Sequence, residues 1–428
     1  MSELLLLKKE DCKSCYKCIR ECALKSIRFS ENRAQIVERE CVYCGHCYVT
    51  CPQSAKEIRQ DTDKARALIA SGRPVIVSLA PSFIADFGVG GLDGMRQALL
   101  KLGFADVEET ARGARIVKTE YERMIASGEH KLIISSCCHS VNLLIQKRYP
   151  QALPYLAKVD SPMLAHAKSI KERVPGSAVV FIGPCISKKD EAEQYGQVDC
   201  VLTFDELIDW LAEEGIELPA GEQPDGTEAR SRFFPTAGGI IRSMDLDDGF
   251  SYIPIDGLHR CMDALEEIER GGMQNCFVEM NACEGSCIGG PVMHRYHSAP
   301  ITCKTRVEQY SGKSGRDFDD QPADDLRKSM QYIGSGAVKP GEAAIQEVLH
   351  KLGKYRPEDE LNCGTCGYST CREKAIAVCQ GKADLTMCLP FLKARAESFS
   401  GAILDNTPNA IMAMDTKLII QQANESAA

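Results

Sequence analysis

Cysteine is the residue type that most constrains what this chain can fold into. The sequence has 22 cysteines in 428 residues. The first residues lack the pattern of a signal peptide, and in a reducing compartment so many thiols indicate metal binding rather than disulfide bonds. Two runs near the start share the spacing C-x2-C-x2-C-x3-C; they are Cys12, Cys15, Cys18 and Cys22, then Cys41, Cys44, Cys47 and Cys51.

These two runs resemble the cysteine runs of bacterial ferredoxins that hold two 4Fe–4S clusters. In such proteins the fourth cysteine of each run ligates the other cluster. The resemblance implies one cluster on Cys12, Cys15, Cys18 and Cys51, and a second on Cys41, Cys44, Cys47 and Cys22. Residues 26–37 between the runs are typical of a β-hairpin with its turn at Glu31-Asn32. Two zinc sites are the alternative, although zinc needs only two C-x2-C pairs per site.

Residues 63–347 alternate apolar strands with helical patterns. We expect strands over Val75–Leu79, Lys131–Ser135, Ala178–Ile182 and Cys276–Ala282, and a helix over Gly91–Leu102 that stops at Gly103. Each of these strands is followed by a cysteine or by the turn Ala80-Pro81-Ser82. Sites in open α/β sheets form beyond the carboxyl ends of strands. The pattern therefore indicates one cluster held by scattered cysteines.

Three loops in this region resemble the signature loops of iron–iron hydrogenases, in the same order and behind the ferredoxin module that the family carries. They are Ser135-Ser136-Cys137-Cys138, the segment 183–189 (GPCISKK) and the segment 282–290 (ACEGSCIGG). The resemblance implies an H-cluster, which is a 4Fe–4S cubane bridged by one cysteine to a diiron unit carrying CO, cyanide and an azadithiolate. The implied cubane ligands are Cys138, Cys185, Cys283 and Cys287, with Cys287 as the bridge.

The same resemblance implies roles for residues around the diiron unit. Cys137 would relay protons, Lys188 would hydrogen-bond one cyanide, and the Ala80-Pro81-Ser82 turn would cradle the other. Cyanide is an anionic acceptor, so a buried site needs N–H and O–H donors. Taken singly, a Cys-Cys pair is more often two buried apolar side chains, and Lys188-Lys189 a solvated pair.

The chain departs from the family pattern at several positions. Gly183 and Asn281 stand where well-characterised members have methionines, and His139 stands where a proline is usual. The two proton-pathway glutamates of the family fall on Val117 and Glu120, and its serine falls on Ala157. We therefore expect an altered proton path and slow turnover. Four further cysteines match no ligand position and are expected to be structural; they are Cys200, Cys261, Cys276 and Cys303.

The C-terminal part carries another set of four cysteines. The pattern C-G-x-C-G-x3-C with a distant fourth cysteine resembles a small 4Fe–4S domain over residues 348–392, and zinc is again the alternative. After it, Leu392, Ala396, Phe399 and Ile403 are spaced as in a helix that pairs two subunits or packs on its own domain. Residues 406–424 resemble the first quarter of a PAS domain, so effector domains are expected beyond this sequence. The cysteines of the set are Cys363, Cys366, Cys371 and Cys388.

The overall expectation is a multidomain α+β and α/β protein. It comprises a two-cluster ferredoxin-like domain (1–62), an α/β H-cluster catalytic domain (63–347), a small helical 4Fe–4S domain (348–392) and a linker helix with a truncated PAS start (393–428). The net charge of −9 and the lack of a long basic run disfavour nucleic acid. No apolar stretch reaches the length of a membrane span, so we expect a cytoplasmic protein.

The expected function is reversible oxidation of H2 to protons and electrons, used in hydrogen or redox sensing. The cofactors would be the H-cluster and three accessory 4Fe–4S clusters. The partners would be a redox partner protein, the maturation proteins that install the diiron unit, and a second copy of the chain through the C-terminal helix. The alternative is a non-catalytic, hydrogenase-like iron–sulfur assembly protein that binds no diiron unit.

Overall fold

The computed structural model describes residues 4–221, 228–320 and 325–427. The chain forms two compact units, each built from two separate segments. Unit 1 comprises Met1–Asp11 and Glu38–Gly336, and unit 2 comprises Cys12–Val37 and Ala337–Ala428. Residues 1–62 are thus divided between the units, and the four-domain division stays a prediction.

A four-stranded parallel sheet forms the first layer of unit 1. Its strand order is β6 (Asp106–Glu109), β5 (Val75–Leu79), β8 (Ala178–Gly183) and β9 (Cys200–Thr203). All five residues of β5 and all six of β8 are buried. Strands covered on both faces need continuous apolar runs, which is why β5 and β8 were recognisable in the sequence. The predicted strand Val75–Leu79 is confirmed residue for residue.

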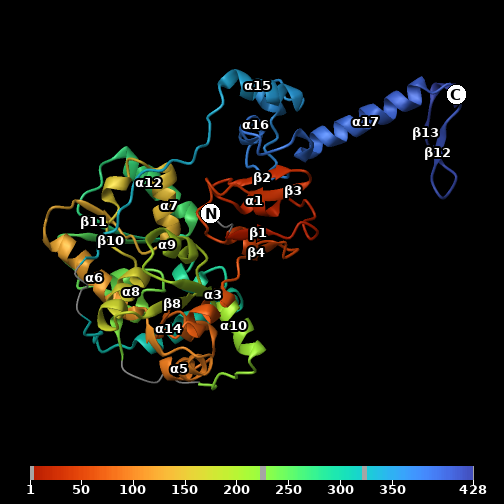
Figure 1. Ribbon diagram of the computed structural model, residues 1–428. Helices are drawn as coiled ribbons and strands as arrows, with labels where there is room; N and C mark the ends of the chain where they lie inside the picture. Colours follow the sequence, from red (N-terminus) through yellow and green to blue (C-terminus); the bar gives the residue numbers. More distant parts are fainter. Residues whose placement is uncertain (1–3, 222–227, 321–324, 428) are drawn as a thin grey trace. The chain divides into compact units, whose positions relative to one another are not determined.

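A second parallel sheet of three strands holds two of the predicted cysteine-bearing segments. Its order is β10 (Ser251–Asp256), β11 (Cys276–Asn281) and β7 (Leu132–Ile134). Strand β10 was not predicted, and none of its residues is fully buried. Figure 1 shows α12 (Leu258–Arg270) and α7 (His139–Arg148) beside this sheet.

Helices cover both sheets of unit 1. Helix α5 (Leu92–Lys101) ends where predicted, because Gly103 takes a φ of +98° that favours glycine. Helix α6 (Ala111–Ala126) packs along α8 (Pro162–Arg173). The other α-helices are α2 (His46–Val49), α3 (Thr62–Ala70), α4 (Phe83–Asp86), α9 (Ser187–Tyr195), α10 (Phe204–Glu213), α11 (Gly239–Ser243), α13 (His294–Ser298) and α14 (Pro300–Ser311).

Smaller elements complete unit 1. Strand β1 (Leu5–Leu7) pairs antiparallel with β4 (Lys56–Ile58), so the second cysteine run lies between two paired segments. Short 3-10 helices are η1 (Leu153–Tyr155), η2 (Arg230–Phe233) and η3 (Ser286–Gly289).

Unit 2 joins the first cysteine run to the C-terminal part of the chain. The predicted hairpin is confirmed as β2 (Ile27–Ser30) paired with β3 (Arg33–Ile36), and both turn residues, Glu31 and Asn32, have positive φ. This is the backbone of a type I′ turn. The helices of the unit are α1 (Lys17–Glu21), α15 (Glu342–Lys351), α16 (Cys371–Cys379) and α17 (Leu389–Asn406), with 3-10 helices η4 (Pro357–Asp359), η5 (Leu385–Met387) and η6 (Glu425–Ala427).

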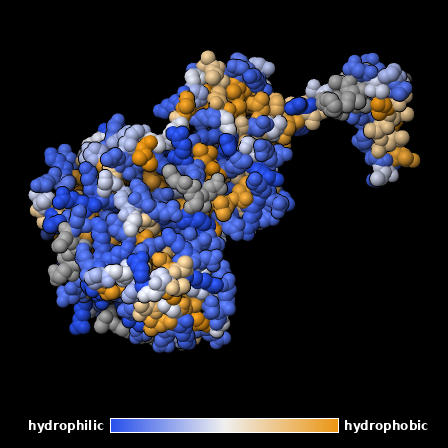
Figure 2. Space-filling view, viewed as in Figure 1, coloured by the Kyte–Doolittle hydropathy of each residue, from blue (hydrophilic) through white to orange (hydrophobic). Residues whose placement is uncertain are grey.

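A second hairpin follows α17 and consists of β12 (Met412–Met414) and β13 (Ile420–Ala423). Figure 2 shows apolar side chains on this hairpin, where Met412, Leu418 and Ile420 are exposed. Of the proposed pairing seam on α17, the side chains of Phe399 and Ile403 lie outside the described residues. Pairing of two subunits through α17 and the PAS assignment therefore stay predictions.

No helix in the described ranges is both long and apolar enough to cross a membrane.

Candidate functional site

The loops that follow β5, β7, β8 and β11 meet around one cavity of about 100 Å³ in unit 1. Because all four strands end toward this cavity, both parallel sheets contribute to the same site. Its lining includes eight residues predicted for the H-cluster site, namely Ala80, Pro81, Ser82, Cys137, Cys138, Cys185, Lys188 and Cys287.

The four predicted cubane cysteines are close enough to influence one another electrostatically. Burial raises the pKa of the Cys283 thiol, and the charges of Cys185, Cys138 and Cys287 raise it further. Burial and the same neighbours also raise the pKa of Cys287. Thiols with raised pKa values would lose their protons on binding a cluster, because the positive charge of its iron ions stabilises the thiolates. In the described part of the chain, no three Cys, His, Asp or Glu side chains lie as close together as the ligands of a single metal ion.

Helix termini add favourable dipoles at this site. Cys138 immediately precedes α7; burial raises the pKa of its thiol, while the backbone N–H groups of Ala282 and Val141 lower it. Cys185 lies two residues before α9. The N-terminus of a helix carries a partial positive charge that stabilises anions. Thiolates and an anionic cofactor are therefore stabilised at these two positions.

Two side chains place hydrogen-bond donors at the cavity. The Ser82 hydroxyl lines the cavity, is fully buried, and has no hydrogen-bond partner among the described residues. Lys188 donates to the carbonyl of Cys137 at 3.0 Å and to Glu191 at 2.5 Å. An ammonium has three N–H groups, so one remains for a ligand in the cavity. An unpartnered buried donor is costly, and a bound acceptor would remove that cost.

Glu191 is a functional neighbour that the sequence did not indicate. It lies one turn after Lys188 on α9 and is also paired with the buried Lys328. Burial by itself raises the pKa of Glu191, but Lys188 and Lys328 outweigh burial and hold the pKa well below its usual range. The Ser161 hydroxyl donates to the same carboxylate at 3.1 Å. Glu191 therefore fixes the ammonium of Lys188 at the edge of the cavity.

Cys137 has a different environment from the cubane cysteines. Burial raises the pKa of its thiol to about 12, although a hydrogen bond with Tyr121 and the charge of Lys188 lower it. The Tyr121 hydroxyl lies 3.3 Å from the Cys137 sulfur and 3.1 Å from the Ser136 hydroxyl. Cys137 is therefore a neutral thiol in this structure, joined to a buried hydroxyl pair.

Two of the positions that depart from the family pattern, Gly183 and Asn281, have defined surroundings in the structure. A Cβ on Gly183 would lie 2.6 Å from the ring of Phe181, so Phe181 occupies the space that a larger side chain would need. The amide of Asn281 donates to Glu279 at 3.2 Å. Burial raises the pKa of Glu279 to about 7.

Two of the three residues at the family's proton-path positions are apolar and lie in apolar surroundings. Val117 and Ala157 belong to one hydrophobic core, and Cys137 packs against it. Glu120 is paired with Arg123 at 2.5 Å. The surroundings of Val117 and Ala157 next to Cys137 are therefore apolar.

The second cysteine run lies beside the signature loops. A Cβ on Gly45 would lie 2.6 Å from Pro291, which directly follows the third loop. It would lie 2.8 Å from Ile186, which belongs to the second loop. The charge of Cys44 is among those that raise the pKa of Cys283. Since these residues all belong to unit 1, Cys44 lies within electrostatic range of the cubane ligands.

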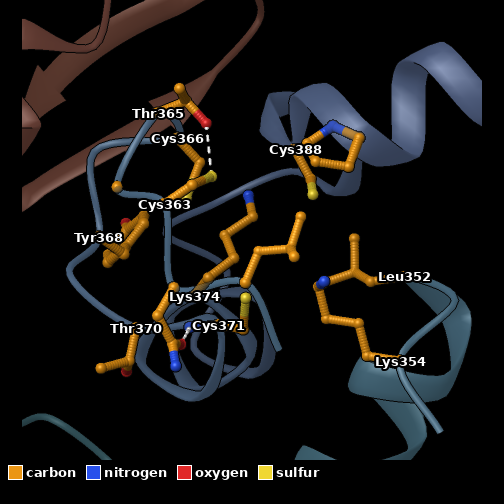
Figure 3. A pocket seen from close by; sticks show the side chains of 14 residues that line it. Leu352, Lys354, Cys363, Thr365, Cys366, Tyr368, Thr370, Cys371, Lys374 and Cys388 are labelled. Atoms are coloured by element: carbon orange, nitrogen blue, oxygen red, sulfur yellow. Dashed lines mark hydrogen bonds between the residues drawn. The ribbon is translucent and has the colours of Figure 1, made fainter. Parts of the chain in front are cut away.

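The four C-terminal cysteines line a single pocket in unit 2, and Figure 3 shows their side chains around Lys374. The Cys363 sulfur hydrogen-bonds with the Thr365 hydroxyl at 3.0 Å. Burial lowers the pKa of Lys374 to about 8, while Cys366 and other anions raise it. Four thiols around a buried ammonium are a suitable donor set for an anionic cluster. The cysteines are Cys363, Cys366, Cys371 and Cys388.

The cysteines predicted to be structural are all buried; they are Cys200, Cys261, Cys276 and Cys303. Cys379, on α16, is exposed and does not line the C-terminal pocket.

Comparisons with known proteins agree with this arrangement. Residues 73–291 match the family described as "Iron only hydrogenase large subunit, C-terminal domain", and residues 359–390 match "Putative Fe-S cluster". The chain is 27% identical to the NADP-reducing hydrogenase subunit HndD of Solidesulfovibrio fructosivorans over 65% of this chain and 60% of that protein. It is also 27% identical to the cytosolic Fe-S cluster assembly factor NAR1 of Yarrowia lipolytica, over 43% of this chain and 45% of that protein.

The matches thus span 60% of the length of the first relative and 45% of the second. A solved structure of the [FeFe]-hydrogenase HydA1 from Chlamydomonas reinhardtii is 20% identical over 69% of this chain and 95% of that one, with a TM-score of 0.49. The first family match covers just over half of the sequence and includes all three signature loops. The chain is an iron–sulfur protein and belongs to the family of iron-only hydrogenase large subunits.

Proposed function

We propose that this protein is an iron–iron hydrogenase that reversibly oxidises H2 to protons and electrons. The observation that carries the proposal is the convergence of the three signature loops and the Ala80-Pro81-Ser82 turn on one buried cavity. Residues that only a diiron unit would need line that cavity alongside cubane ligands. An iron–sulfur carrier would have no use for Lys188 and Ser82 as paired donors.

The proposed ligands of the cubane are Cys138, Cys185, Cys283 and Cys287, with Cys287 as the bridge to the diiron unit. When bound, this cofactor supplies the iron chemistry that splits and forms H2. Lys188 and the Ala80-Pro81-Ser82 turn would hold the cyanide ligands of that cofactor through N–H and O–H donors. Apolar side chains around the cavity exclude water; they include Met163, Phe181, Phe234 and Ile240.

Cys137 is the proposed proton carrier between the cofactor and the protein. A thiol with a raised pKa transfers a proton without keeping a permanent charge in a buried site. The Tyr121 and Ser136 hydroxyls lie next to Cys137 and can accept or donate in turn. Because Val117 and Ala157 provide no proton-carrying group, we expect transfer to be slow.

Slow turnover suits a protein that reports hydrogen or redox state rather than one that produces hydrogen. The altered proton path and the PAS-like start after α17 both support sensing. In this proposal, electrons pass through the two ferredoxin-type clusters and the C-terminal cluster to a redox partner protein. Separate maturation proteins would install the diiron unit.

The competing function is non-catalytic iron–sulfur assembly. It is favoured by the likeness to NAR1, whose name describes a cluster assembly factor, and by the departures at Gly183 and Asn281. The cubane cysteines alone would serve either function. The presence of Cys137, Lys188 and Ser82 on one cavity supports hydrogenase over assembly.

A hydrogen-exchange assay tests the proposal. The anaerobic protein, loaded with clusters and then with the diiron unit, is incubated under D2 in ordinary water. We expect HD and H2 to form, and a viologen dye to be reduced under H2, both at low rates. Absence of isotope exchange from protein with a full complement of iron would contradict hydrogenase activity and favour assembly.

A further inference from the structure

The first cysteine run and the C-terminal cysteine loop are in direct contact within unit 2. The Arg20 guanidinium on α1 donates to the carbonyls of Gly364 and Thr365, each at 3.4 Å. The ammonium of Lys25 donates to the carbonyl of Gly367 at 3.2 Å. These three carbonyls lie in the loop between Cys363 and the start of α16. The first cysteine run therefore contacts the loop that carries Cys363 and Cys366.

This contact is close-packed as well as polar. Gly367 has a φ of +91°, and a Cβ on it would lie 3.1 Å from the buried Ile19 side chain and 3.3 Å from the Tyr16 carbonyl. A second attachment is the hydrogen bond from the Phe29 backbone N–H to the Lys382 carbonyl at 2.7 Å. Any larger residue at 367 would push the loop away from α1, so the backbone of the loop is fitted to this helix.

Lys25 is placed between the two cysteine sets. Besides Gly367, its ammonium donates to the carbonyls of Ile19 at 3.1 Å and Arg20 at 2.8 Å, which engages all three N–H groups. Burial lowers the pKa of Lys25, and the charges of Cys22 and Cys366 are among those that raise it. One cation is therefore in electrostatic range of a cysteine from each set.

We propose that the C-terminal cluster and the ferredoxin-type clusters share an electron-transfer junction at this contact, in which Lys25 is the positioning residue. The inference rests on the proposed cluster content, although not on hydrogen activity. One electron passes from one site to the other without proton transfer or bond change, and an external one-electron carrier supplies or removes it. Reduction adds negative charge to a site, so a nearby fixed cation stabilises the reduced state of both clusters.

The test uses full-length protein reconstituted with iron and sulfide, without the diiron unit. Its clusters are titrated with dithionite at set potentials and followed by electron paramagnetic resonance. In Lys25→Met we expect two signals to become harder to reduce, with the ratio of reduced to oxidised cluster falling about threefold or more at a fixed potential. A tenfold fall corresponds to about 59 mV for a one-electron couple.

Two control variants distinguish the effect of losing the charge of Lys25 from the effect of disturbing the fold. Lys25→Arg keeps the cation and should retain most of the wild-type reduction behaviour. Lys17→Met removes an exposed lysine from α1 and should leave both signals unchanged. If Lys25→Met shifts neither signal, or shifts only one of them, Lys25 is not shared between the sites and the proposal fails.

A second measurement addresses the junction itself. Cys366→Ser removes a ligand of the C-terminal cluster, and the ferredoxin-type signal should then lose the broadening and fast relaxation caused by a neighbouring reduced cluster. An unchanged line shape and relaxation would overturn the junction, as would the lack of any C-terminal cluster signal in wild-type protein. Neither failure would affect the hydrogenase proposal, because the diiron unit is absent throughout.

Discussion

Cys137 lies next to the proposed cubane ligands but is not itself one of them. The proposed proton transfer depends on its thiol. Replacing it with alanine removes the only thiol between the cavity and the Tyr121 hydroxyl among the described residues. Proton transfer by a positioned side chain contributes about 100-fold to 10,000-fold to a rate. We therefore predict that Cys137→Ala slows D2 exchange at least about 100-fold while the infrared bands of the bound cofactor persist.

The matched control for Cys137→Ala is Cys276→Ala. Cys276 is also buried and stands at the start of β11, away from the cavity lining. Its replacement should leave the exchange rate within about twofold of wild type, since only local packing changes. Equal loss of activity in both variants would show that Cys137 has no special role.

Glu279 makes the stability of the protein depend on pH. It is fully buried, and burial raises its pKa from 4.5 to about 7, although backbone N–H groups such as that of Ile241 lower it. Between these values the folded protein keeps a proton that the unfolded chain releases. The stabilisation is therefore complete below about pH 4.5 and is lost as the pH rises through about 7.

We predict that the free energy of unfolding falls by up to about 3 kcal/mol over this pH range because of Glu279 alone. Denaturant unfolding of anaerobic, cluster-loaded protein at several pH values measures the slope. Glu279→Gln should unfold with a flatter pH dependence. If the two proteins show the same slope, Glu279 does not titrate in this range.

Among the helices, α6 and α8 pack closely at Gly113. A Cβ on Gly113 would lie 2.1 Å from the Pro162 carbonyl oxygen and 2.7 Å from the His166 Cβ. Overpacking a core costs about 1–3 kcal/mol, which exceeds the gain of about 1 kcal/mol in helix propensity. Once the gain in helix propensity is subtracted, Gly113→Ala should lower the free energy of unfolding by up to about 2 kcal/mol.

Gly94→Ala on α5 is the control for this prediction. The nearest heavy atom to a Cβ there is the Pro219 Cγ at 3.2 Å, a side-chain atom on a separate segment. Its free energy of unfolding should change by less than about 1 kcal/mol. Thermal or denaturant unfolding of both variants decides the matter, and equal effects would mean that α6 and α8 can separate without cost.

The elements that the sequence predicted are those whose pattern is local. Strands β5 and β8 are continuous apolar runs, and the β2–β3 turn is marked by Glu31-Asn32. Strand β10 lacked such a signal because none of its residues is fully buried. The division of the parallel strands between two sheets was also hidden, since strand order depends on long-range pairing.

Over the whole molecule, the grouping of the cysteines could be predicted from the sequence, whereas the residues that surround them could not. Cysteine spacing and the signature loops are sequence signals. By contrast, Tyr121 reaches Cys137 from α6, and Lys328 reaches Glu191 from a segment 137 residues away. A single tyrosine or lysine in a sequence gives no signal of such long-range contacts, so these supporting residues are identified only from the structure.

We propose that the cavity between the signature loops holds a diiron unit with CO and cyanide ligands. The most direct test is an infrared spectrum of the anaerobic, maturated protein, recorded under argon and then under H2. We predict sharp CO and cyanide bands that shift when H2 is added, and cyanide bands that move in Lys188→Met. If a proven maturation procedure yields no such bands, the claim is contradicted and the protein is an iron–sulfur carrier or scaffold.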